Sequence, residues 1–378
     1  MTRLQSFRGI RYDRELSSHL REWTRPAGPD LQGSDLPERH VARLRSSRLL
    51  TQWQKERVLR PESAPMIYLV QQEFLLLEQS LTRFGWLGAV EPGELTAVQR
   101  PDPREAEAHY RHLKSTGLYL ENLLAVCRDR RDSLQALAAG VATAPPDLEM
   151  EDEERTWHRI WLVSDAEIQR QVQDCLAEET LALACGHELH EAARRYASEQ
   201  KPGPARRCPV VVCPSRDPGL VVLPVHRGLR GLDPMQFQQL DEALEADAEL
   251  EPWERSLPEL LYHLWLHQGT SLGMARGARL YLLRHPQGDD RVFLEELLSR
   301  HLSAEQLRSP QILQAQSDPD AALERVQKGE LQLAFFVNPV RIEELLEAAD
   351  RGRMLPPASL AVHPAPRAGL VLYGVRSS

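Results

Sequence analysis

Hydrophobic residues recur along the chain at two different spacings. Apolar positions at helical spacing predict amphipathic helices over 41–53, 104–139, 165–178, 257–268, 319–328 and 341–350. Short apolar runs predict strands at 65–70, 157–161, 210–212, 220–223, 278–283, 331–337 and 369–373. Asp35, Asp165 and the pair Asp233-Pro234 supply helix-start signals. The expected fold class is therefore α+β or mixed α/β, with helices around short mixed sheets.

Two shifts in composition suggest how the chain is divided. Residues 144–155 combine prolines with an acidic run that is typical of a solvated loop. Residues 200–209 are rich in proline and basic residues and interrupt the preceding helical pattern. We place a boundary there, giving an N-terminal α/β region at 1–204 and a C-terminal α/β region at 205–378. A length of 378 residues agrees with two domains.

Charge and composition exclude several classes of protein. The formal net charge is −9 and there is no basic domain or tail, so no nucleic-acid partner is expected. No run approaches the ~18 apolar residues of a membrane span, and the start lacks the apolar core of a signal peptide. Five scattered cysteines do not form a disulfide framework. We expect a cytoplasmic protein with reduced thiols and no membrane partner.

The segment with the most chemical content is LALACGHELHE at 181–191. It indicates a buried strand, a turn at Gly186 and a helix whose first amides would attract an anion. On that helix His187 shares a face with His190 and Glu191. Three interpretations stay open: a phosphate or nucleotide cradle, a solvated helix whose histidines pair with carboxylates, and a metal site formed by His187 and His190, with Cys185, Cys208 and Cys213.

Two further segments carry candidate residues. Cys208 and Cys213 flank a valine run bounded by prolines, which predicts a buried strand with the two thiols on opposite faces and no metal site. His226 and Arg227 follow a strand-like run, where ligands often bind in open α/β sheets; the alternative is a surface turn.

Several segments, taken in chain order, resemble a known family. They lie at 7–12, 158–161, 220–227, 335–339, 354–357 and 369–371. In this pattern the chain resembles the bacterial and archaeal family called domain of unknown function 1015. The family's hallmark, Ala-Asp-Gly-His-His-Arg-Tyr-Glu-Thr-Ala, corresponds to residues 184–193 here. The positions that match are Ala184, Gly186, His187, Glu191 and Ala193.

The resemblance carries implications for fold and activity. The hallmark is similar to the phosphate-contacting motif of the ParB and sulfiredoxin superfamily, which includes free-serine kinases. By this resemblance the N-terminal part would be ParB-like, and family members would bind a nucleotide and transfer phosphate to a hydroxyl group. Resemblance of fold does not fix function.

The chain departs from the hallmark at positions that matter for phosphate. Leu189 replaces an arginine that would donate to phosphate, and Glu188 adds negative charge beside an anion site. Cys185 replaces an aspartate. Arg194 or Arg195 would have to compensate, from more than a turn away. An early Pro-Pro-Tyr-Asp segment of the family survives only as Asp30.

Two functional hypotheses follow from the resemblance and its departures. In the first, the chain is a degenerate homologue, or pseudoenzyme, that binds a small molecule or a protein partner. In the alternative, it is a phosphotransferase acting on a small hydroxyl compound such as serine, with a nucleotide and magnesium as cofactors. Its catalytic groups would be His187, Glu191, Asp30 and His226, and its cofactor-binding groups Gly186 and Arg227.

Overall fold

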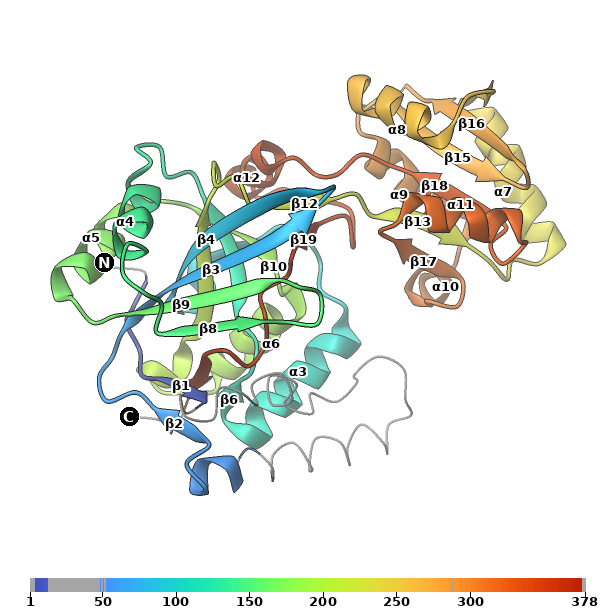
Figure 1. Cartoon of the computed structure of the whole chain (residues 1–378). Coiled ribbons are helices and arrows are strands. Elements are labelled where there is room, and N and C mark those ends of the chain that lie inside the picture. The colour runs from blue at the N-terminus through green and yellow to red at the C-terminus, as the bar shows by residue number, and fades with distance from the viewer. Residues whose placement is uncertain (1–3, 13–47, 49, 51, 287, 376–378) are drawn as a thin grey trace. The chain divides into compact units, whose positions relative to one another are not determined.

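The computed structural model describes residues 4–12, 48, 50, 52–286 and 288–375. The chain divides into two compact units (Figure 1). Unit 1 comprises Met1–Val221, Ile342–Met354 and Val362–Ser378, and unit 2 comprises Val222–Arg341 and Leu355–Ala361. Helices combine with mixed and antiparallel sheets, which confirms the predicted mixed α/β fold class. No helix in the described part of the chain is long and apolar enough to cross a membrane.

Unit 1 is built on an eight-stranded sheet. Parallel pairing joins β5 to β10 and β7 to β11, and the other neighbours are antiparallel. The central strands β7 and β11 are buried along their whole length, as their continuous apolar sequences require. In spatial order the strands are β5 (Leu95–Ala97), β10 (Leu181–Cys185), β7 (Leu123–Cys127), β11 (Cys208–Pro214), β4 (Gln79–Val90), β3 (Ile67–Leu76), β9 (Trp157–Val163) and β8 (Leu148–Glu151).

Capping residues fix the helix ends in unit 1. The Asp102 carboxylate accepts the N–H groups of Arg104 and Glu105 at the start of α3, and Gly117 ends that helix in a left-handed conformation. Asp165 caps α5 as predicted. Helix α3 packs along α6, and α4 packs along α5 (Figure 1). The helices are α3 (Pro103–Thr116), α4 (Ser133–Val141), α5 (Ala166–Leu176), α6 (His187–Ser198) and α12 (Ile342–Arg351).

Segments from both ends of the chain meet in a second, four-stranded sheet of unit 1. Its antiparallel order is β2 (Leu59–Pro61), β1 (Gly9–Tyr12), β20 (Leu372–Gly374) and β6 (Leu118–Tyr119). A separate pair is formed by β12 (Val221–Leu223) and β19 (Ala361–His363). The last residue of β19 and the residues that lead from it to β20, 363–371, form a segment that we call the C-terminal strap.

Unit 2 has an antiparallel six-stranded sheet with helices on both faces. Strand alternation sends Met274 and Phe335 to one face, where α7 and α9 pack, and Ala275 and Phe336 to the other, where α8 and α11 pack. In spatial order the strands are β14 (Glu249–Trp253), β16 (Arg279–Arg284), β15 (Ser271–Arg276), β18 (Leu333–Phe336), β13 (His226–Leu229) and β17 (Leu313–Gln316). The helices are α7 (Pro234–Asp247), α8 (Leu257–Leu266), α9 (Asp290–His301), α10 (Ala304–Arg308) and α11 (Pro319–Gln327).

The structure differs from the sequence-based predictions in one domain boundary and in two assignments of secondary structure. The two units do not separate at 204/205, because β11 pairs with β4 and β7 inside unit 1 and the chain returns to unit 1 at 342–354 and 362–378. Helices α3 and α4 are separated by the strands β6 and β7. The acidic run contains β8, which pairs with β9. The helix predicted at 41–53 lies largely outside the described residues.

Candidate functional site

The predicted strand, turn and helix around Gly186 are present. Strand β10 ends at Cys185, and α6 begins at His187, which confirms this prediction. Gly186 adopts a left-handed conformation with φ of 88°. Its carbonyl accepts the N–H of His190 at 2.8 Å, which closes the first turn of α6.

Glycine is required at this turn for two reasons. The left-handed conformation disfavours a side chain, and a Cβ atom at position 186 would lie 2.8 Å from Cδ2 of Leu123. We expect Gly186→Ala to lower the free energy of unfolding by about 1–2 kcal/mol. Urea unfolding would measure this against Gly93→Ala, where a Cβ meets nothing within 4 Å. Equal stability of the two variants would contradict the argument.

The two histidines of α6 point into the protein. His187 is 6% exposed and its Nε2 has no hydrogen-bond partner among the described residues. Burial, with a smaller contribution from His190, lowers the pKa of His187 to about 4. His190 is 4% exposed, and its Nε2 lies 2.8 Å from the carbonyl oxygen of Pro92 in the 3₁₀ turn η2 (Pro92–Glu94). Both imidazoles are buried and neither pairs with a carboxylate of the described residues, so the interpretation as a solvated helix with such pairs is wrong.

The acidic side chains of α6 are engaged at its surface. Glu188 accepts the N–H of Asp102 at 3.3 Å. Glu191 is half-exposed and pairs with Arg194 at 3.5 Å. Arg195, the other arginine that could compensate for the altered hallmark, pairs with Glu107 at 2.5 Å. Both arginines therefore have acidic partners on or beside α6.

Two departures from the hallmark remove charged side chains from the turn. Leu189 is 6% exposed and packs as part of the core, at the position of the family's arginine. Cys185 has replaced the aspartate, and burial raises the pKa of its thiol to about 11. The thiol is therefore protonated at neutral pH and is a poor nucleophile. The turn offers backbone amides to an anion, with no positively charged side chain in its first helical turn.

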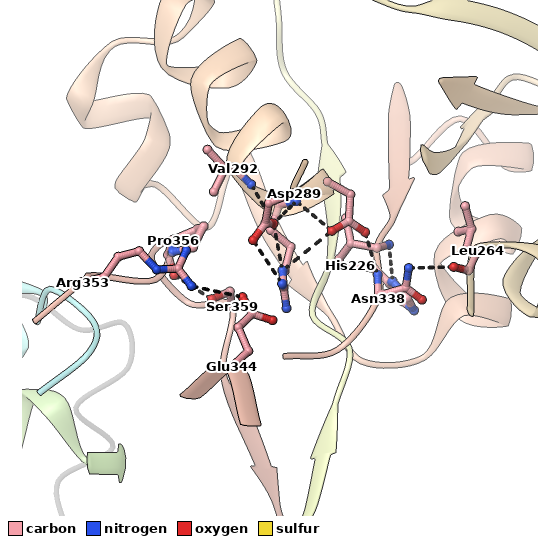
Figure 2. A network of polar contacts seen from close by, with 12 residues as sticks. His226, Leu264, Asp289, Val292, Asn338, Glu344, Arg353, Pro356 and Ser359 are labelled. Carbon is pink, nitrogen blue, oxygen red and sulfur yellow. Dashed lines mark hydrogen bonds and ion pairs between the residues drawn. The ribbon is translucent and has the colours of Figure 1, made fainter. Parts of the chain in front are cut away.

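The remaining candidates are Asp30, His226 and Arg227. Asp30 lies outside the described residues. His226 and Arg227 belong to unit 2; as predicted they follow a strand, β12, and they begin β13 instead of forming a surface turn. His226 is 1% exposed and its Nδ1 accepts the N–H of Val337 at 3.2 Å (Figure 2). Burial, followed by the charge of Arg227, lowers the pKa of His226 to about 4.

Arg227 is held by carbonyl groups of its own unit. Its guanidinium donates to the carbonyl oxygens of Val225, Pro357 and Ala358 at 3.2, 2.9 and 3.0 Å. The side chain is 9% exposed. These contacts fix the position of its guanidinium within unit 2.

The cysteine pair lies in the interior of unit 1. Cys208 and Cys213 are both fully buried in β11. Burial raises the pKa of both thiols, to about 12 for Cys213. In the part of the chain that the structure describes, no group of three or more His, Cys, Asp or Glu side chains is placed to hold a metal ion.

Sequence reasoning missed a buried polar cluster on the eight-stranded sheet. It comprises Gln72, Arg83, Asn122, Asp152 and His158, each at most 9% exposed. Polar side chains on β3, β4 and β9 offered a signal, because they interrupt otherwise apolar strands. Their partners come from distant parts of the sequence, so spacing could not reveal the cluster.

Comparisons with known proteins identify a family and several distant structural neighbours. A model of the family described as "Protein of unknown function (DUF1015)" matches residues 29–304. A conserved hypothetical protein from Pyrococcus furiosus is 14% identical with a TM-score of 0.40, covering 75% of this chain and 93% of its own. A free serine kinase in complex with AMP is 13% identical with a TM-score of 0.36, covering 74% and 91%. SbnI from Staphylococcus aureus is 8% identical with a TM-score of 0.39, covering 75% and 87%. No curated protein matches the chain.

Proposed function

The chain belongs to the family described as "Protein of unknown function (DUF1015)", and we propose that it is a member whose hallmark site has lost phosphoryl transfer and kept a binding or regulatory role. One observation carries this proposal. The side chains of the first two turns of α6 are either buried, like His187 and Leu189, or paired, like Glu188 and Glu191. The first turn of α6 itself carries no lysine or arginine.

Phosphoryl transfer depends on positive charge and positioning around the phosphates. The helix amides alone contribute about 0.3–1 kcal/mol of preference for an anion. A charge-assisted arginine contact adds about 1.5–3 kcal/mol, and Leu189 cannot make one. Arg194 and Arg195 are engaged with Glu191 and Glu107. The resulting balance supports weak binding of a triphosphate and slow turnover or none.

The alternative function is transfer of phosphate from a magnesium nucleotide to a small hydroxyl compound such as serine. It would need His187 and Glu191 to face the substrate. His187 is buried and neutral, with its pKa lowered to about 4 by burial, and Glu191 pairs with Arg194 at the surface. The geometry of α6 therefore favours the binding role.

Calorimetry with ATP and magnesium tests the proposal directly. We expect affinity no tighter than millimolar and no phosphate transfer to serine. Glu188→Gln keeps an oxygen for the N–H of Asp102 and removes the negative charge, so it should bind ATP about two- to fivefold more tightly. Leu189→Arg combined with Glu188→His should strengthen binding further, provided that thermal unfolding shows the variant folded.

A matched control is Glu191→Gln, which removes an equal charge one turn further along α6, and should change ATP affinity less than Glu188→Gln. Micromolar affinity of the unmodified protein, with transfer of phosphate to serine, would establish the alternative function instead.

A further inference from the structure

A small cavity lies inside unit 1 beneath the C-terminal strap. Its volume is about 20 Å³, which is room for one water molecule or the end of a small ligand. Apolar side chains from the eight-stranded sheet and from the strap enclose it. The polar side chains that line it are Gln72, Asn122, His158 and Arg367.

His158 presents a hydrogen-bond acceptor at this cavity. Its Nε2 lies 2.9 Å from Oδ2 of Asp152, whose other oxygen accepts the N–H groups of Glu154 and Thr156. Burial opposes ionisation of Asp152, yet these hydrogen bonds hold its pKa below the ordinary value. The carboxylate can only accept, so Nε2 carries the ring proton and Nδ1 is left as a lone-pair acceptor.

Two buried hydrogen-bond acceptors of the cluster, Nδ1 of His158 and Oδ1 of Asn122, have no partner among the described residues. His158 is 1% exposed, and its Nδ1 has no hydrogen-bond partner in the described part of the chain. The same holds for Oδ1 of Asn122, which is 9% exposed. A buried acceptor without a hydrogen bond lowers the stability of the folded protein. Both atoms are therefore suited to bind a group that donates hydrogen bonds.

The cluster also holds a buried cation that has no hydrogen-bonded carboxylate among the described residues. Arg83 is 2% exposed, and among the described residues its guanidinium contacts only neutral oxygens. These belong to Gln72 and to the strap carbonyls of His363 and Pro364. Gln72 also donates to the strap carbonyl of Ala365 at 3.1 Å. Backbone carbonyls are weaker partners for a guanidinium than a carboxylate is.

The acidic groups near Arg83 have hydrogen-bond partners of their own, although the charge of Asp217 interacts favourably with that of Arg83. Asp217 accepts the N–H groups of Phe84 and Gly219 at 3.0 and 2.9 Å, and burial raises its pKa. Asp152 is committed to His158. Arg367 of the strap forms an ion pair of 3.1 Å with the exposed Glu153.

We propose that this cavity is the inner end of a ligand site that the C-terminal strap covers, and that the site takes a small carboxylate bearing a hydroxyl or ammonium group. An ammonium group of the ligand donates to both Nδ1 of His158 and Oδ1 of Asn122, whereas a hydroxyl group, which has one proton, donates to one of them. Its carboxylate pairs with Arg83 in place of the strap carbonyls. The strap lifts to admit the ligand, because the present volume holds only one end of it. This site does not depend on nucleotide binding at α6.

The test uses the full chain and four small probes. Glycolate and glycine carry both groups, acetate carries only the carboxylate, and ethylamine carries only the donor. We expect calorimetry to show the better of glycolate and glycine binding about tenfold more tightly than acetate, which lacks the donor, and ethylamine, which lacks the carboxylate, since a lost hydrogen bond weakens binding by up to about that factor. The ¹⁵N resonance of His158 Nδ1 should shift with the preferred probe and not with acetate.

Three variants and a control decide the assignment. Asn122→Leu and His158→Phe should each weaken binding of the preferred probe about tenfold, and Arg83→Met should abolish it. Arg159→Met, which removes a neighbouring arginine of β9 paired with Glu73 and Glu149, should leave it unchanged. Equal binding of glycolate and acetate, no binding of any probe at millimolar concentration, or full binding by folded Asn122→Leu would overturn the proposal. The probes contain no phosphate, so this outcome is separate from that of the nucleotide experiments.

Discussion

Acidification from neutral pH to about pH 4 is expected to destabilise each unit by about 3 kcal/mol, through one buried histidine in each. His187 in unit 1 and His226 in unit 2 have pKa values lowered from 6.5 to about 4, in both cases mainly by burial. Above pH 6.5 these side chains are neutral in the folded and the unfolded chain, so they contribute no pH dependence there. Between 6.5 and 4 only the unfolded chain takes up the protons, and stability is lost as the pH falls.

Urea unfolding at several pH values would measure this effect. His187→Gln should flatten the acid dependence of unit 1, and His226→Gln that of unit 2, although both variants will be less stable at neutral pH. A dependence that persists in full in both buried-site variants would show that other groups cause it; His158 and His190, whose pKa values burial also lowers, would be the next to replace.

Local sequence predicted the turn at Gly186 because its determinants are local. An apolar run ends at a glycine, and alanines and a tyrosine follow at helical spacing. Which side chains of α6 would be buried depends instead on the neighbours of the helix. His190 bonds Pro92, 98 residues earlier in the chain. A histidine pattern that suits a solvated helix therefore became a buried one through packing against α3 and η2.

The strands β6 and β7 also could not be predicted from the local sequence. The apolar pattern over 104–139 was compatible with helix, but Gly117 ends α3 and the next apolar run enters the centre of the sheet between β10 and β11. A short apolar run has no helical or strand identity of its own. Its pairing partners, which lie elsewhere in the sequence, decide it.

The buried polar cluster beneath the strap was the least predictable feature. Arg83 reaches carbonyls about 280 residues away, and an arginine in a chain with 46 basic residues, nearly all arginine, carries little information by itself. Once the strap is in place, the same arginine is a buried cation with neutral partners. Its chemical meaning arises only from the tertiary structure.

Replacing Gly219 by alanine is expected to destabilise unit 1 by about 3 kcal/mol, because the backbone leaves no room for a side chain. A Cβ atom there would lie 2.4 Å from the carbonyl carbon of Thr82 and 2.5 Å from the nitrogen of Arg83. Both are backbone atoms of β4 and cannot move aside as a flexible side chain would. The turn would be pushed from the strand, and Asp217 would lose its hydrogen bond with the N–H of Phe84.

The comparison that isolates this effect is Gly140→Ala in α4, where a Cβ meets nothing within 4 Å. There alanine should stabilise the helix by about 0.5–1 kcal/mol. Urea midpoints of the two variants should therefore move in opposite directions. Because Gly219 lies against the backbone of Arg83, Gly219→Ala should also weaken binding of the preferred small-carboxylate probe, whereas Gly140→Ala should not. A loss of less than about 1 kcal/mol for Gly219→Ala would mean that the turn can move away from β4 at little cost, and the close approach would then not be what fixes the position of Arg83.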